Sequence, residues 1–105
     1  MAQRTLTLLS GATATGAGST VEPETAARAF QASGLTSSGA GSATVLVQVS
    51  ADGTNWMTLA TITLTLTTST SSDGLHSTTL WKYVRGNISA ISGTGAAVTL
   101  ICNCN

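Results

Sequence analysis

The chain has 105 residues, of which 8% are charged, and its four basic and four acidic side chains leave no net charge. This composition argues against nucleic-acid binding and against an anionic membrane surface, because both are bound through clustered lysine and arginine. A chain of this length forms one domain, and a nearly uncharged surface favours association, so we expect a homo-oligomer or a larger assembly.

The first quarter of the chain has two parts. Thr5–Ser10 alternates threonine with leucine, which predicts a short strand or an arm. Gly11–Glu24 is rich in small residues and shows no period, which predicts a loop or an extended arm that can reach a neighbouring subunit. We therefore expect an N-terminal strand and arm in residues 1–25 and a β-sandwich domain in residues 26–105. No apolar run approaches the roughly 20 residues of a spanning helix and no secretory signal is recognisable, so we expect synthesis in the cytoplasm.

Residues 26–51 contain one segment of ambiguous secondary structure, a predicted loop and a clearly predicted strand. Ala26–Ser33 fits a strand or a helical turn, since alanine and arginine are good helix formers. It is shorter than the ~12 residues that an isolated helix needs, so a strand is favoured. Gly34–Ser42 predicts a loop. Ala43–Ala51 has a valine at every second position and predicts a strand with one buried face.

Two Asp-Gly pairs predict tight turns. Asp52 and Gly53 lie between two alternating segments, where Asp-Gly is among the strongest hairpin signals. Asp73 and Gly74 follow a polar run and predict a second turn. Each aspartate is expected to accept hydrogen bonds from nearby backbone N–H groups, which is a structural role and not a catalytic one.

The second half supplies the remaining strands. Trp56–Thr61 and Ile62–Thr67 predict strands, the latter with a threonine face suited to a shared surface. Leu80–Ala90 and Ala96–Cys102 predict two long strands joined as a hairpin through Ile91–Gly95, where two glycines supply positive φ. About six to eight strands separated by turn signals predict an all-β fold, a small antiparallel β-sandwich or jelly roll.

The aromatic residues have two possible uses. Trp56, Trp81 and Tyr83 are predicted to be core aromatics that close the ends of a small core, because each carries a large apolar area. Exposed aromatics that stack on sugar rings, as in a carbohydrate-binding module, are the alternative. Strand alternation places Lys82 and Arg85 on opposite faces, so they are not expected to form a basic patch.

Groups for catalysis or metal binding are few. Asp73 and His76 could form a triad with a serine, but the spacing is non-specific and no G-x-S-x-G motif is present. Glu22 and Glu24 flank a proline and could hold a hard cation, although such carboxylates are usually solvated. We therefore predict no enzyme activity, no catalytic residue, no metal and no cofactor.

The two cysteines lie close to the C-terminal end. Cys102 and Cys104 are two positions apart, so on a strand they point to the same side, and a disulfide between them would be strained. A small buried residue is the favoured interpretation, with a metal site or an intermolecular sulfur site as the alternative. Two ligands are too few for a structural zinc, which normally has four.

Two segments carry a resemblance to a known class of proteins. They are VQVSADGTNWMTLATITL, residues 47–64, and LWKYVRGNISAISGTGAAVTL, residues 80–100. Together they resemble small all-β structural proteins encoded in the virion gene clusters of tailed bacteriophages. The resemblance covers about the last sixty residues and includes no catalytic residues.

The resemblance implies a component of the virion. The leading expectation is a capsid decoration, or cement, protein that binds the major capsid protein on the capsid exterior as an oligomer, with a trimer favoured over a dimer. A tail or head-tail structural protein, or a carbohydrate-binding module on the virion surface, is the alternative. Neither nucleic acid nor a membrane is expected as a partner.

Overall fold

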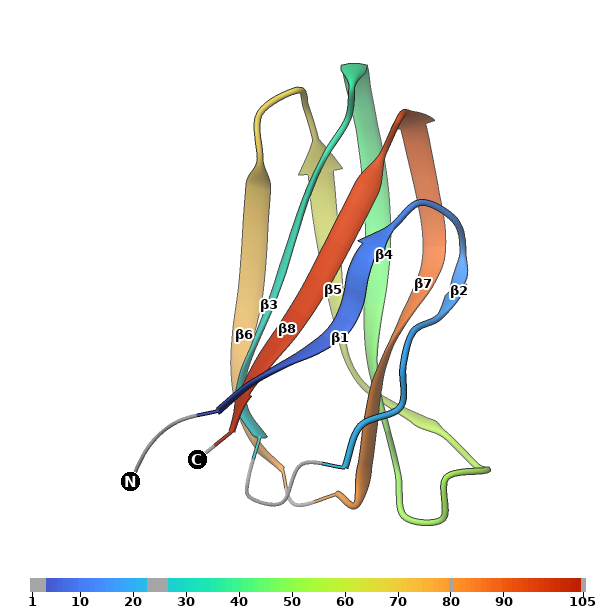
Figure 1. The fold of residues 1–105 in the computed structure, drawn as a ribbon, viewed down its shortest axis with the longest axis vertical. Helices are drawn as coiled ribbons and strands as arrows, with labels where there is room; N and C mark the ends of the chain where they lie inside the picture. The colour runs from blue at the N-terminus through green and yellow to red at the C-terminus, as the bar shows by residue number, and fades with distance from the viewer. Residues whose placement is uncertain (1–3, 23–26, 80, 105) are drawn as a thin grey trace.

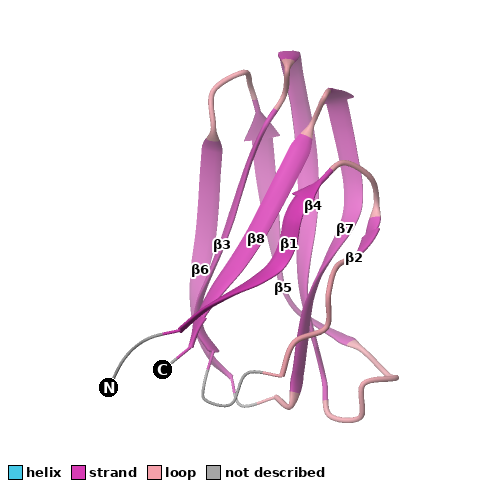
Figure 2. Ribbon diagram, in the orientation of Figure 1, coloured by secondary structure: helices cyan, strands magenta, loops and turns pink. Residues whose placement is uncertain are grey.

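The computed structural model is a sandwich of two four-stranded antiparallel sheets, and it describes residues 4–22, 27–79 and 81–104 (Figure 1). Sheet A has the order β1-β8-β3-β6 and sheet B the order β2-β7-β4-β5. Figure 2 shows strands and loops, with no helix among the described residues. Those residues accordingly include no helix capable of crossing a membrane. The strands are β1 (Arg4–Ala12), β2 (Gly16–Ala17), β3 (Ala27–Leu35), β4 (Ser38–Ser50), β5 (Met57–Leu66), β6 (Ser71–Thr79), β7 (Tyr83–Thr94) and β8 (Ala97–Cys104).

The strand pairing is that of a jelly roll. β1 pairs with β8, β2 with β7, β3 with β6 and β4 with β5, all antiparallel. The chain thus folds back on itself about the β4–β5 turn. The resulting double ribbon rolls up, so that β3 also pairs with β8 and β4 with β7. The predicted all-β fold and its two antiparallel sheets are confirmed, and the pairing selects the jelly roll.

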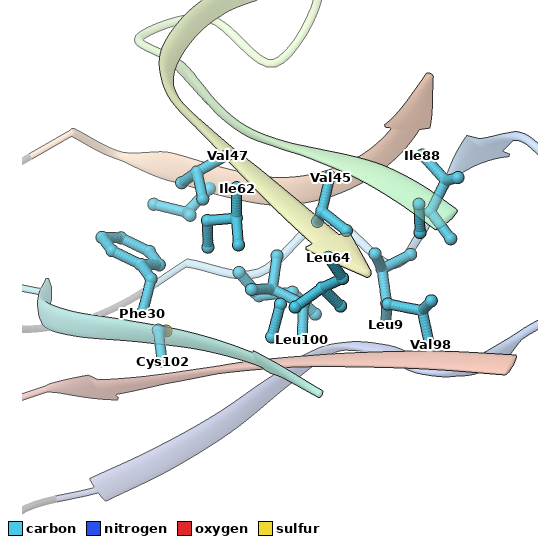
Figure 3. Packing of buried hydrophobic residues seen from close by; sticks show 14 of the residues in the cluster. Leu9, Phe30, Val45, Val47, Ile62, Leu64, Ile88, Val98, Leu100 and Cys102 are labelled. Carbon is cyan, nitrogen blue, oxygen red and sulfur yellow. The ribbon is translucent and has the colours of Figure 1, made fainter. Parts of the chain in front are cut away.

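The core lies between the two sheets and consists of apolar side chains at every second position of the strands. In β4 the three predicted valines, Val45, Val47 and Val49, are at most 1% exposed. β5 contributes every second residue from Ile62 to Leu66 in the same way. Sheet A faces them with Phe30, Leu100 and other buried side chains (Figure 3). Burial of each such side chain stabilises the fold by about 1.5–3 kcal/mol, so the alternating segments explain most of the core.

The last two strands do not form the predicted hairpin. β7 belongs to sheet B and β8 to sheet A, so the chain crosses from one sheet to the other after Thr94. Gly93 and Gly95 do adopt positive φ, at 118° and 65°, and they turn the chain across the sandwich. Two successive strands that each have one apolar face show the same alternation whether they pair side by side in one sheet or lie in opposite sheets. The alternating pattern therefore did not distinguish the two arrangements.

Three other local predictions are corrected. The predicted loop Gly34–Ser42 is mostly strand, with Thr36 and Ser37 joining β3 to β4. The two segments expected on either side of position 61 form a single strand, β5. Asp73 and Gly74 form no turn: they lie inside β6, opposite Ala32 and Gln31. A Cβ on Gly74 would lie 2.6 Å from the Phe30 carbonyl oxygen, so here glycine permits close strand approach.

The N-terminal segment is part of the sandwich. β1 is a sheet strand whose Leu8 and Leu9 lie in the core. The segment expected to be an arm continues along β7: the Gly18 N–H donates to the Gly86 carbonyl at 2.8 Å. Val21 and Val84 exchange two backbone hydrogen bonds of 2.9 Å. β1, Gly16–Gly18 and Val21 therefore bind their own chain through backbone pairing, while residues 13–15 and 19–20 are exposed connections, as a loop would be. Contact of this segment with a neighbouring subunit stays a prediction, and Glu24 lies outside the described residues.

Candidate functional site

The β4–β5 turn is organised around the Asp52 carboxylate. Its Oδ1 accepts hydrogen bonds from the backbone N–H groups of Thr54 and Asn55, at 2.8 and 2.9 Å, and from the Ser50 hydroxyl at 2.9 Å. Its Oδ2 accepts one from the Asn55 side-chain amide at 3.0 Å. Gly53 follows with φ 78° and donates its N–H to Ser50 Oγ at 2.9 Å. These bonds fix the shape of the turn.

The same hydrogen bonds determine the protonation of Asp52. The backbone N–H of Asn55 and then that of Thr54, followed by the Asn55 and Ser50 side chains, hold the pKa of Asp52 well below its usual range. The carboxylate is therefore ionised at ordinary pH, and it accepts four hydrogen bonds from the turn. This geometry gives Asp52 a structural role in positioning the residues that follow.

Beside this turn, the outer face of sheet B carries an arginine packed on a tryptophan. Arg85 and Gln48 lie directly opposite each other on β7 and β4, and Arg85 Nε donates to Gln48 Oε1 at 2.8 Å. The Arg85 guanidinium carbon lies 4.2 Å from the centroid of the Trp56 ring. All three side chains are half-buried. The four N–H groups on the Arg85 Nη atoms have no acceptor among the described residues.

A second aromatic residue extends this surface. Tyr83 lies opposite Ser50, and its ring packs against Gly53, where a Cβ would meet Tyr83 Cε2 at 3.3 Å. Lys82 Nζ lies 5.3 Å from the centroid of the Tyr83 ring. The strand alternation from which Lys82 and Arg85 were predicted to lie on opposite faces does not extend to Lys82. Lys82 precedes β7, where strand alternation does not apply, and its side chain reaches the ring of Tyr83.

We call this cluster the Trp56 surface; it consists of Gln48, Trp56, Lys82, Tyr83 and Arg85. Sequence reasoning treated its members separately because the cross-strand register that joins them is not visible in the sequence. The available signal was Gln48, a polar residue in the outward-facing position of a strand whose inward positions are valines.

The predicted core aromatics lie at different depths. Trp81 is half-buried and packs against the core cluster. Trp56 and Tyr83 are also half-buried, but they lie on the outer face, so the core assignment does not hold for them. Phe30 is the aromatic residue that fills the core, at 1% exposure. The reason is the strand register: Val84 points inward, so its neighbours Tyr83 and Arg85 point outward.

The candidate catalytic and metal-binding groups lie partly outside the described residues. Asp73 is exposed on β6, and its Oδ1 accepts the Gly74 N–H at 2.8 Å. The side chain of His76, like Glu24, lies outside the described residues. Glu22 is exposed. No group of three or more histidine, cysteine, aspartate or glutamate side chains occurs among the residues searched, which are the described ones.

Cys102 lies in the core, fully buried among sheet A side chains that point toward sheet B (Figure 3). It occupies the inward position that alternates with the half-buried Ile101 and Asn103. The side chain of Cys104 lies outside the described residues. The geometry therefore agrees with a small buried residue at position 102.

The outer face of sheet A carries a shallow depression of about 90 Å³ lined by Ala29, Gln31, Ile101 and Asn103. Asn103 is held by the Thr5 hydroxyl, which donates to Asn103 Oδ1 at 3.0 Å. Sites for drug-sized ligands are roughly 300–1,000 Å³, so this depression is too small to hold one.

One edge of the sandwich is long and uncharged. β5 ends sheet B, and its ten residues include no charged residue, glycine or proline. Two large apolar side chains are exposed near its start: Met57 at 59% and Leu59 at 36%. Exposed edges are usually protected by charge, proline or bulges. β5 has neither charge nor proline, and its one register shift lies near its start, so the rest of this edge is a candidate contact surface.

Comparison with known proteins supports the fold. No family model matches the sequence, and no curated protein matches it. The crystal structure of the PBSX exported protein XepA matches with a TM-score of 0.56 and 14% sequence identity. The match covers 97% of this chain and 37% of XepA, so this chain spans about a third of that protein's length. At this identity the likeness shows a shared β fold alone.

Proposed function

We propose that the protein is a structural component of a bacteriophage virion. More narrowly, we propose a capsid decoration protein that binds the major capsid protein on the capsid exterior as an oligomer. The observation that carries the proposal is the position of the two segments that resemble virion proteins. Residues 47–64 span the end of β4, the Asp52 turn and most of β5, and residues 80–100 include all of β7. These three strands are adjacent in sheet B, where residues 47–50 of β4 lie between the start of β5 and the start of β7. Residues 97–100 belong to β8 in sheet A.

The physical character of sheet B suits binding through many weak contacts. A decoration protein is held by many copies of a weak contact, and linked contacts raise the effective affinity without any one strong site. β5 offers outward-facing threonine hydroxyl groups for such contacts. Jelly rolls occur in both capsid and lectin domains, so the fold is compatible with the role without selecting it. XepA is named an exported protein, which agrees with a working location outside the cell.

The proposal is tested by add-back. Heads of the encoding phage are prepared from a strain that lacks the gene, and the purified chain is mixed with them. We expect the chain to sediment with the heads, to saturate at a fixed ratio to the major capsid protein, and to raise the temperature at which the heads release DNA. Binding to isolated tails would support the tail or head-tail alternative. Binding to neither particle would overturn the virion proposal.

The Trp56 surface favours a second candidate, carbohydrate recognition at the virion surface. Sugars are bound by aromatic rings that stack on them and by polar groups that form hydrogen bonds with their hydroxyls. The Trp56 surface has both, since Trp56 and Tyr83 supply rings and the Arg85 guanidinium supplies N–H donors. Binding of host cell-wall glycans should be lost in Trp56→Ala and Arg85→Ala but retained in Gln31→Ala, on the opposite sheet. Equal binding by all three variants would rule this candidate out.

For both candidates we propose binding without a chemical reaction, metal or cofactor. Neither nucleic acid nor a membrane is a proposed partner, because the sequence has four basic residues in all.

A further inference from the structure

The four edge strands of the sandwich are not equally protected. β2 has two residues, and the register of β1 shifts twice along its pairing with β8. β6 contains Asp73 and Gly74, a charge and a strand-weakening residue. β5 pairs with β4 without interruption from Ala60 to Leu66, and this stretch carries no charge. β5 is thus the edge whose outward backbone N–H and C=O groups are best placed to pair with another strand.

We propose that β5 pairs antiparallel with β5 of a second copy of this chain, which joins two B sheets into one continuous sheet. The inference rests on the proposed function in one respect: it names the contact through which the proposed oligomer forms, and it makes that oligomer a dimer in place of the trimer that was first favoured. A second copy is the occupant that the chemistry favours. β5 presents the same uncharged edge on both copies, and the chain has no net charge to oppose self-association.

The register of this contact follows from the alternation of β5. Ile62 and Leu64 point into the core, while Thr61, Thr63 and Thr65 point outward. Residues directly opposite each other in an antiparallel pair share a face, so a two-fold contact must be centred on a residue. Thr63 is the midpoint of the uninterrupted stretch from Ala60 to Leu66. Centring there gives the longest pairing and places Thr61 of each copy opposite Thr65 of the other.

The exposed apolar residues of β5 lie just outside this register. Leu59 is the extra residue of a bulge between the Ala60–Val47 and Thr58–Gln48 pairs, and with Met57 it lies outside the uninterrupted stretch. In the register centred on Thr63, positions 57 and 59 fall opposite positions 69 and 67 of the second copy.

Cysteine cross-linking tests the register directly. In a Cys104→Ser background, Thr63→Cys should form disulfide-linked dimers with itself under mild oxidation, because position 63 meets its own copy. Thr61→Cys and Thr65→Cys should cross-link poorly alone and efficiently when mixed. Failure of Thr63→Cys to cross-link, or equal cross-linking of all three variants alone, would overturn the proposal.

Sedimentation of the native chain tests the contact independently. We expect a concentration-dependent dimer, and Thr63→Lys should raise its dissociation constant about tenfold or more by placing two like charges face to face. Gln31→Lys, on the outer face of an inner strand of sheet A, should leave it unchanged. A native chain that remains monomeric at about 100 μM, or an oligomer indifferent to Thr63→Lys, would overturn the inference.

The two proposals fail separately. Heads that bind a monomeric chain would leave the virion role standing and end the β5 contact. A chain that dimerises through Thr63 but binds no phage particle would do the reverse.

Discussion

At the scale of single residues, Asp52 shows how an ionisable group can be structural. It accepts four hydrogen bonds within its own turn, from two backbone N–H groups and two side chains. Its position before a glycine was sufficient to predict this role. The partnership of Trp56, Arg85 and Gln48 could not be predicted in the same way, because it depends on the register between β4 and β7.

The low pKa of Asp52 predicts a pH-dependent contribution to stability. The folded-state pKa lies below the unfolded value of about 3.9, so ionised Asp52 stabilises the fold above about pH 4. That contribution is lost as the pH falls toward the folded-state pKa. The difference in unfolding free energy between the native chain and Asp52→Asn should therefore be constant from pH 7 to about pH 5 and shrink below about pH 4.

Urea unfolding at a series of pH values measures this difference. Asp73→Asn is the matched control, because it removes the same charge from a carboxylate that accepts one hydrogen bond among the described residues. An Asp52→Asn difference that stays constant down to pH 2 would contradict the prediction.

At the scale of elements, the sequence predicted strands better than it predicted their partners. The second part of β4 and most of β8 were predicted, because valine and other apolar residues recur there at every second position. The first five residues of β4, Ser38–Ser42, were predicted as a loop because they are serine, glycine and alanine without alternation. The pairing of β8 was wrong, since β7 and β8 lie in different sheets. Period-two alternation identifies which face of a strand is buried. It does not identify the strand that lies beside it or the sheet that covers it.

Close packing between the two sheets makes Gly86, on β7, a sensitive position. A Cβ there would lie 2.7 Å from Leu100 Cδ2 and 2.9 Å from Leu9 Cδ1, both in the opposite sheet. Gly86→Ala should therefore destabilise the protein by about 1–3 kcal/mol through overpacking.

A double-mutant cycle with Leu9→Ala, which removes one of the two contacts, identifies this mechanism. Denaturant unfolding of the four proteins should show a smaller cost of Gly86→Ala in the Leu9→Ala background. Equal costs in both backgrounds would show that the contact with Leu9 is not responsible.

At the scale of the whole molecule, the N-terminal strand is part of the fold. Thr5–Ser10 alternates threonine with leucine and is followed by small residues, so this segment was predicted to be a strand and an arm. The sequence does not show which strand pairs with it. The structure supplies the partner, β8, which pairs with β1 and completes sheet A. An all-β sandwich was therefore predictable from alternation and turn signals, whereas the assignment of each strand to one of the two sheets was not.

The importance of β1 predicts a contrast between adjacent residues. Leu8 is 1% exposed, while Thr7 beside it faces solvent. Leu8→Ala should cost about 3 kcal/mol of unfolding free energy, and Thr7→Ala less than about 0.5 kcal/mol. Thermal or urea unfolding measures both values. Equal small effects would mean that β1 is a dispensable attachment.

The pairing of the first strand with the last also determines how this sandwich can be joined to other proteins. Arg4 lies opposite Cys104, so the chain enters and leaves the fold at one place (Figure 1). Such a unit can be spliced into a surface loop of a host protein through two short linkers, without spreading the loop apart. Joining the two ends and reopening the chain at an exposed turn would give a permuted protein with the same core.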